Sequence, residues 1–418
     1  MAAQLNLQRN TKVFISTVDL ASGAAATSVV PANTWQVEIL AGYAVSQAAA
    51  TQDITSLESG TSPDRSQQRF NTALNPVDWN FQAYLKPTGM NKTSGSTGKH
   101  ASGNSMPVAD WFMWQAMMSN VTWASGTTTR SNWQDDGKFA LAVRADAANV
   151  YPHSANFSTA SEYHLYFQMD NVVYQVANAT VNQGSIDAAI DGIATTTWTG
   201  FGTNLIELRN ASRDNAISVF GGVLNAGTSV TANSNAYALT AQAAYHPWNT
   251  YNVSGAISSA SFIKNRLSTI TIQHAPSAVG AGVTFTFPVT ALSFDYNNNI
   301  TYLTPEELAS LNSPIGQFAG ARAISGSLSA YLRSGSSDTA QFLKQVVEDT
   351  RTTSAATSNA NLRIGGSTAP YFAINMPAVA FELPTHTVED IIGISVNFLA
   401  QETSKGTGDE LTFIVAKS

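Results

Sequence analysis

The chain has no cysteine among its 418 residues, and charged residues make up only 12% of it. Without cysteine, a disulfide framework and a thiolate metal site are both excluded. The charged share is about half of what is usual for a globular protein, and a surface so poor in charge is weakly protected against self-association. This composition suits a subunit that buries much of its surface against copies of itself, and it would also suit a secreted adhesin.

The sequence also lacks the segments that direct a chain into a membrane. Residues 1–6 do not form a basic region followed by an apolar run, so we expect no secretory signal. No stretch is long and apolar enough to span a bilayer. The net charge of −7 argues against general binding of nucleic acid. We therefore expect a soluble protein with no membrane partner, which stays where it is made or leaves by lysis.

No pattern in the sequence predicts a catalytic, cofactor-binding or metal site. Six isolated histidines lack the spacing of metal ligands; they are His100, His153, His164, His246, His274 and His386. The neighbouring carboxylates at 135–136 and 389–390 would point to opposite faces of a strand. Residues 200–202 begin like a dinucleotide-binding loop but lack its third glycine and its helix. We expect a structural protein, with no enzyme activity, cofactor or metal.

Two helices are predicted. The first begins at Pro107, because proline is favourable in a first helical turn. The second begins after Asp338, with Gln341 three residues later in the spacing of a capping box. Large side chains near the first helix suggest a ligand pocket, but their helical spacing favours packing on a sheet; they are Trp111, Met113, Trp114, Met117 and Met118.

Long strands are predicted over residues 35–45, 77–86, 283–294 and 324–333. In these segments apolar residues alternate with polar ones, which is the period of a strand with one buried face. The polar segments 46–76 and 295–323 join the strands in pairs, and we expect both to be loops. Hairpin loops typically have about two to five residues, so two such long connections are unusual.

A short sequence near the second long strand occurs twice. Residues 80–86 read Asn-Phe-Gln-Ala-Tyr-Leu-Lys, and residues 327–333 read Ser-Leu-Ser-Ala-Tyr-Leu-Arg. Around both copies the predicted elements follow the same order: a strand, a long loop, a strand, a helix and more strands. Because the whole series of elements is repeated, we interpret the chain as a duplicated domain.

The repeat sets the predicted domain boundaries. Residues 1–205 form the first domain, with an irregular insertion at about 120–160. Residues 206–260 form a linker or inserted subregion, and residues 261–418 form the second domain. We expect the two domains to superpose, with Tyr84 on Tyr331.

The stretch from 172 to 200 resembles a known family. It contains Asp191-Gly192-Ile193-Ala194, followed by Trp198 and Gly200. This succession is similar to that of the major tail tube proteins of long-tailed bacteriophages, and the two domains resemble the fused double-domain type. The resemblance implies a mainly β fold: two tandem β-sandwich or barrel domains, each flanked by a short α-helix, which assemble into rings with a continuous inner β-barrel.

The resemblance also implies a function and partners. Rings would stack into the tail tube of the virion, assembled in the host cytoplasm, and the tube would conduct genomic DNA into the host. Two domains per chain favour rings of three chains with pseudo-sixfold symmetry, with hexameric rings as the alternative. Besides itself, the chain would contact terminator, baseplate or tip, and tape measure proteins. Double-stranded DNA would pass without specific binding, because an acidic chain presents no basic wall to its phosphates.

The two long loops carry the candidate assembly residues. Our hypothesis is that each loop becomes ordered against the next ring in the stack, and the alternative is a loop packed on its own domain. The candidate residues are Ile54, Leu57, Arg65, Phe70, Leu303, Leu308, Ile315 and Phe318.

Two other functions remain open at this point. A phage capsid or capsid-decoration protein would share the composition but would not need two matched copies of the long hairpin. A β-rich adhesin would need a surface aromatic groove and a trimeric stem, which the sequence does not indicate.

Overall fold

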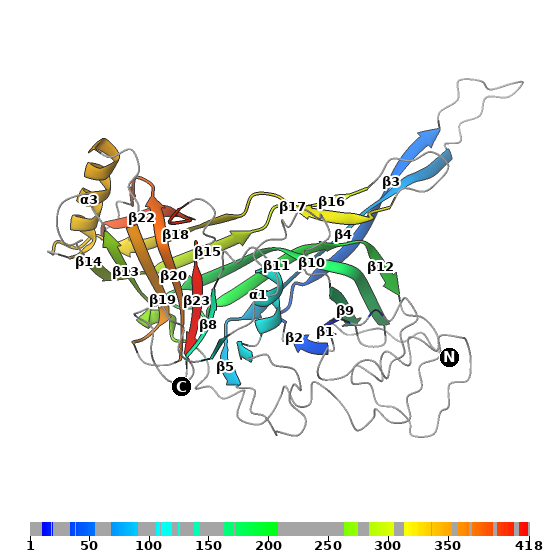
Figure 1. Ribbon diagram of the computed structural model, residues 1–418, viewed down its shortest axis with the longest axis horizontal. Coiled ribbons are helices and arrows are strands. Elements are labelled where there is room, and N and C mark those ends of the chain that lie inside the picture. Colours follow the sequence, from blue (N-terminus) through cyan, green and yellow to red (C-terminus); the bar gives the residue numbers. More distant parts are fainter. Residues whose placement is uncertain are drawn as a thin grey trace, which may run out of the picture.

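The structure is a computed structural model. It describes residues 11–17, 19, 34–37, 39–54, 68–90, 106–108, 110–118, 124–125, 138–142, 163–169, 172–207, 263–274, 284–304, 313–335, 337–352, 358–367, 370–387, 391–404 and 409–416. The described part is mainly β, as the sequence predicts, and its strands pair antiparallel. It is elongated, with a helix at one end and a projecting β-hairpin at the other (Figure 1).

The described residues of the first half of the chain form twelve strands and one α-helix. They are β1 (Thr11–Ser16), β2 (Thr34–Val37), β3 (Ala44–Ile54), β4 (Gln68–Tyr84), β5 (Pro87–Met90), β6 (Met106–Val108), α1 (Trp111–Met117), β7 (Ala124–Ser125), β8 (Lys138–Ala142), β9 (Tyr163–Met169), β10 (Val172–Ala189), β11 (Thr195–Gly202) and β12 (Asn204–Glu207).

In the second half, the part that the structure describes has eleven strands, one α-helix and one 3-10 helix. They are η4 (Asn265–Leu267), β13 (Thr269–His274), β14 (Thr284–Pro288), β15 (Ala291–Asn297), β16 (Ile300–Leu303), β17 (Gly316–Ala319), β18 (Ala323–Tyr331), α3 (Thr339–Thr352), β19 (Ser358–Gly365), β20 (Tyr371–Phe381), β21 (Thr385–Thr387), β22 (Gly393–Gln401) and β23 (Thr412–Ala416). Both expected helices are present, and their first residues are Trp111 and Thr339.

The same pairing order occurs in both halves. In the first, β2, β1, β9, β10 and β12 are neighbours in that order, and the end of β10 continues through β11 and β4 to β3. In the second, β14, β13, β19, β20 and β23 are neighbours, and the end of β20 continues through β22 and β18 to β15. A helix follows β4 in the first half and β18 in the second.

The register also matches at the sequence repeat. Tyr84 pairs with Thr195, and Tyr331 pairs with Gly393. One residue further on, the Leu85 amide donates to the Ala194 carbonyl at 2.9 Å. The Leu332 amide makes the same bond to the Ile392 carbonyl, also at 2.9 Å.

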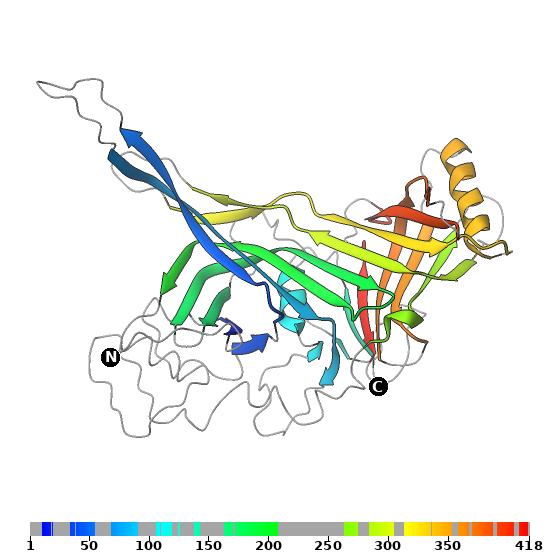
Figure 2. The same ribbon diagram turned by 180° about the vertical axis from the view of Figure 1, so that it is seen from behind.

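One sheet runs through both halves. β10 pairs with β15 from Gln183↔Asn297 to Ala189↔Ala291, so the order β3-β4-β11-β10-β15-β18-β22-β20 is continuous (Figure 2). A second connection comes from the predicted insertion, where β8 pairs with β23 of the second half. Both connections are made by backbone hydrogen bonds, which are obligatory for buried strands.

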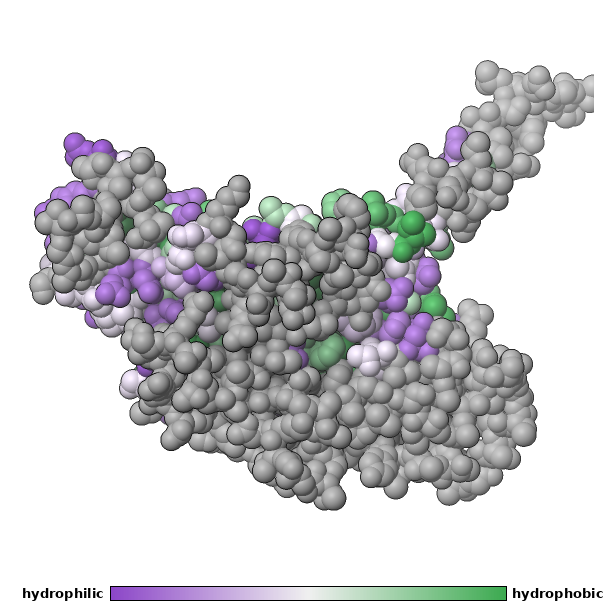
Figure 3. Space-filling model, in the orientation of Figure 1, coloured by the Kyte–Doolittle hydropathy of each residue, from purple (hydrophilic) through white to green (hydrophobic). Residues whose placement is uncertain are grey.

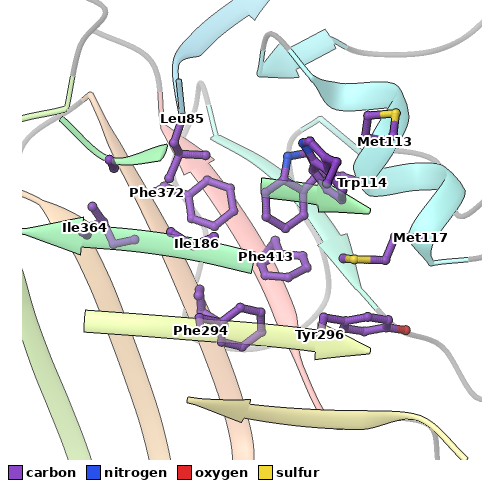
Figure 4. Close-up of a cluster of buried hydrophobic side chains, with 14 of the residues drawn as sticks. Leu85, Met113, Trp114, Met117, Ile186, Phe294, Tyr296, Ile364, Phe372 and Phe413 are labelled. Atoms are coloured by element: carbon purple, nitrogen blue, oxygen red, sulfur yellow. The ribbon is translucent and has the colours of Figure 1, made fainter. Parts of the chain in front are cut away.

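The main core also spans both halves. Trp114 on α1 is fully buried, and its ring lies 4.6 Å from that of Phe413 and 5.3 Å from that of Phe372, centroid to centroid (Figure 4). The Trp198 ring meets it edge-on at 4.8 Å. The expected packing of the first helix on the sheet is therefore confirmed, and the partners Phe372 and Phe413 come from the second half.

A buried carboxylate holds this aromatic cluster in place. Asp110 accepts hydrogen bonds from the Trp114 indole at 3.0 Å, the Trp198 indole at 2.8 Å and the Thr196 hydroxyl at 2.7 Å. Burial raises the pKa of Asp110 above its ordinary value, although these three donors oppose the shift. Both indole N–H groups, which need partners when buried, are thereby satisfied.

This carboxylate predicts a pH dependence of stability. Because its pKa is raised on folding, its contribution is complete below the ordinary aspartate pKa of about 3.9 and is lost as the pH rises through the folded value. Asp110→Asn cannot ionise. We therefore expect the free energy of unfolding of the native chain, minus that of the variant, to fall as the pH rises from about 4. Urea unfolding at a series of pH values measures this difference, and a difference independent of pH would contradict the prediction.

Several expectations about the long strands were wrong in their bounds. The predicted strand 283–294 is two strands, because β14 ends at Pro288 and β15 begins at Ala291. The predicted strand 35–45 is two strands, because β2 ends at Val37 and β3 begins at Ala44. The predicted loop 46–76 is largely a hairpin, since β3 and β4 stay paired out to Ile54↔Gln68. Most of its described residues are exposed on both faces, so the sequence shows no alternation there. Within 295–323, β16 and β17 likewise form a paired hairpin.

Candidate assembly interface

The contact between the halves is made by the end of β10 and the strand β15. Besides seven backbone pairs, the Gln183 amide donates to Asp295 at 3.2 Å. The Asn265 side chain donates to the Ala189 carbonyl at 3.0 Å, and the Ile190 amide donates to Thr290 at 3.1 Å. This contact joins two different edges, so it is heterologous in type.

The β16/β17 hairpin of the second half lies on β10 and β11 of the first. The Tyr302 hydroxyl bonds to the Asn178 carbonyl at 2.8 Å and to the Thr180 hydroxyl at 3.0 Å. The Tyr302 ring lies 6.0 Å from that of Phe201. Nearby, the Asn298 amide group donates to the Met117 and Val181 carbonyls. The hairpin is thus fixed by side chains as well as by its own strand pairing.

The β3/β4 hairpin, called the arm below, projects beyond the body at the end opposite α3 (Figures 1 and 2). At its far end Arg69 forms an ion pair with Asp53 at 2.6 Å. This pair is solvent-exposed, and such pairs contribute roughly 0–1 kcal/mol. Within the described part of the chain, the outer edge of β3 has no partner strand. The arm therefore presents a strand edge on which another chain can pair.

Large apolar side chains are exposed at the other end of the sheet, on and around β22. They are Tyr331, Leu383, Ile391, Ile392 and Leu399. One counterpart in the first half differs in burial: Ala194 is fully buried, whereas Ile392, which makes the equivalent backbone bond, is 42% exposed. We call these five residues the β22 patch. Exposed apolar groups of this kind mark interaction sites.

The candidate residues predicted from the sequence fall in two hairpins. Ile54 ends β3, and Phe70 lies in β4 with 46% of its surface exposed. Leu303 ends β16, Ile315 precedes β17 with 70% exposed, and Phe318 lies in β17. Hydrophobic residues show on the surface over β16/β17, beside the base of the arm (Figure 3). Leu57, Arg65 and Leu308 lie outside the described residues.

The sequence patterns did not predict the β22 patch. Its residues adjoin the alternating pattern Ile394, Val396 and Phe398, which points into the core. One signal was available: the repeat places Ile392 where the first half has Ala194. A large apolar residue in place of a buried alanine indicates a surface that needs a different partner.

Among the residues that the structure describes, no group of three or more His, Asp or Glu side chains could hold a metal ion. No helix in this part of the chain is long and apolar enough to cross a membrane.

Comparison with known proteins gives one relative along almost the whole chain. No family model matches. The chain is 26% identical over 415 residues to the tail tube protein pb6 of Escherichia phage T5, which covers 97% of this chain and 75% of the relative. Two solved structures are much more distant. The anti-feeding prophage baseplate has a TM-score of 0.24 at 10% identity, covering 32% of this chain and 89% of that one. The sheath/tube terminator of an extracellular contractile injection system has 0.22 at 9%, covering 50% and 99%. The resemblance found in residues 172–200 is confirmed by the relative from phage T5, and the chain is a homologue of a phage tail tube protein.

Proposed function

We propose that this chain is the structural subunit of a phage tail tube, a non-enzymatic component of the virion through which genomic DNA passes into the host. The observation that carries the proposal is the match to a tail tube protein over 97% of the chain. A match of that extent favours the tube over the capsid and adhesin alternatives. The long sheet with an unpaired edge supports it, because a closed assembly removes such edges.

The chain is organised as two tandem tail-tube domains, residues 1–205 and 261–418, joined by 206–260. The identical pairing order of the two halves supports this division, as does the shared register at Tyr84 and Tyr331. Each domain contributes four strands to the inner wall: β3, β4, β11 and β10 from the first, and β15, β18, β22 and β20 from the second.

The subunits form rings by repeating between chains the contact that joins the two halves. Heterologous contacts close into rings when the rotation allows it. With two domains per chain, three chains give six quasi-equivalent domains, and six chains per ring are the alternative. The rings stack through the tips of the two hairpins and end at terminator, baseplate or tip, and tape measure proteins. A map of the tube in which neither hairpin touches the next ring would contradict the stacking role.

Assembly of the purified chain tests this function. We expect concentrated protein to form stacked rings or tubes in electron microscopy, because unassembled chains expose apolar groups and a strand edge. Native mass measurement of single rings is expected to give three chains. Six chains would contradict the trimer and leave the tube intact. Discrete particles or closed shells at every concentration would contradict the tube itself.

A further inference from the structure

The way β16/β17 lies on the first half provides a template for a contact of the arm. In the first half, Phe201 on β11 pairs with Thr180 on β10, and Tyr302 of the hairpin covers both. In the second half, Leu399 on β22 pairs with Ala380 on β20. Phe201 lies six residues after Thr195, and Leu399 lies six residues after Gly393. Since Thr195 and Gly393 are equivalent in register, Leu399 is the counterpart of Phe201.

The covering hairpin also has a counterpart. Asn80 lies four residues before Tyr84, and Ser327 lies four residues before Tyr331. Asn80 pairs with Ala44 on β3, and Ser327 pairs with Ser293 on β15. β3 therefore corresponds to β15 and its continuation β16, and the distal arm corresponds to the β16/β17 hairpin. Asp53 lies nine residues after Ala44, and Tyr302 lies nine residues after Ser293. Asp53 is therefore the counterpart of Tyr302.

The counterpart contact cannot form within one chain. The arm and the β22 patch lie at opposite ends of the molecule (Figure 1). Phe201 is half-buried beneath Tyr302, whereas Leu399 is 49% exposed. The arm at one end and the uncovered Leu399 at the other can meet when copies of the chain are arranged head to tail.

We infer that the distal arm of one copy lies across β20 and β22 of a second copy in the same ring, with Leu399 as its seat. This inference rests on the proposed ring. The first half offers the Thr180 hydroxyl to Tyr302, whereas the second half has Ala380 at that place, so the surface at Leu399 is apolar and offers the arm no hydroxyl. The arm meets it with Thr51 and Asp53, which lie on the same face of β3, and the aliphatic stem of Arg69 covers the leucine while its charge stays paired with Asp53.

The absence of cysteine allows a direct test by thiol cross-linking in assembled protein. The variant Asp53→Cys/Leu399→Cys carries only the two introduced thiols. We expect a short thiol-specific cross-linker to join neighbouring chains, and a ladder on a denaturing gel that stops at three chains for a closed trimeric ring. Gln52→Cys/Leu399→Cys is the matched control, because Gln52 is adjacent but points to the opposite face of the strand. Phe201→Cys/Tyr302→Cys is the intrachain positive control.

The outcomes separate this contact from the tube itself. Tubes visible by microscopy without a ladder from the Asp53/Leu399 variant would overturn the arm contact and leave the tube standing. An equal ladder from the Gln52 control would also overturn it. A ladder that continues far beyond six chains would place the arm between rings and contradict a contact within one ring. A short ladder from protein that never forms tubes would keep the head-to-tail contact and contradict the tube.

Discussion

Leu399→Asp is expected to prevent assembly while leaving the subunit folded. The side chain is 49% exposed in the single chain, so a carboxylate there remains hydrated and costs the fold little. In the ring the same carboxylate would be buried under the arm beside Asp53, and the Arg69 guanidinium there is already paired with Asp53, so the new charge would have no cation of its own. An unpaired buried charge typically costs about 3–5 kcal/mol, and each 1.4 kcal/mol is about tenfold in an equilibrium constant. The assembly constant per contact should fall by at least about a hundredfold.

Sedimentation velocity and circular dichroism measure the two parts of this prediction. We expect the variant to sediment as a monomer at concentrations where the native chain forms large particles, with an unchanged spectrum. Leu399→Met is the matched control, since it keeps size and polarity at the same position and should assemble as the native chain does. Assembly of the Leu399→Asp variant at native concentrations would show that this surface stays in contact with water.

Trp114→Ala is expected to have the largest effect on folding. The indole is fully buried against aromatic rings from both halves, and it donates to Asp110. Removing a buried aromatic side chain lowers the free energy of unfolding by about 3–5 kcal/mol. The substitution also removes the indole N–H, so Asp110 loses one hydrogen-bond donor. Since domains have a net stability of only about 5–15 kcal/mol, this loss is a large fraction of the total.

The Trp114 substitutions are best made in a chain that does not assemble, such as the Leu399→Asp variant. Urea unfolding then measures the lost free energy of unfolding without the contribution of the ring. We expect a lower midpoint for Trp114→Ala and an intermediate one for Trp114→Phe, which keeps a ring but removes the indole N–H. Probes placed in the first and second halves should report one shared transition. A shift below about 1 kcal/mol would mean that the cluster rearranges to fill the space.

The prediction of a duplication comes from a repeat that lies in buried strands. Ala83 and Leu85 point into the core, and their identity is restricted by packing. The helix stripe around Trp114 was predictable for the same reason. Apolar periodicity is informative where one face is buried and the other is not.

The arm and its seat were not predictable from periodicity. Ala48, Ala49 and Thr51 are small or polar and lack the pattern of a half-buried strand. Leu399 continues an alternating strand but belongs to its other face, where an isolated leucine needs no explanation. Its role emerges from the register, because only the pairing of β22 with β18 makes it equivalent to Phe201. A single sequence does not contain that information.

The pairing of β8 with β23 has a consequence for how the chain can be divided. β8 precedes the segment between the halves, yet it hydrogen-bonds from Lys138 to Ala142 along the last strand of the second half. A fragment that ended near residue 206 would leave β8 paired only with β7, and it would leave Trp114 without the rings of Phe372 and Phe413. Each half therefore completes its sheet or its core with residues of the other half. If two separate genes encoded the halves, we expect folded protein only when both products are made in the same cell and bind each other before either aggregates.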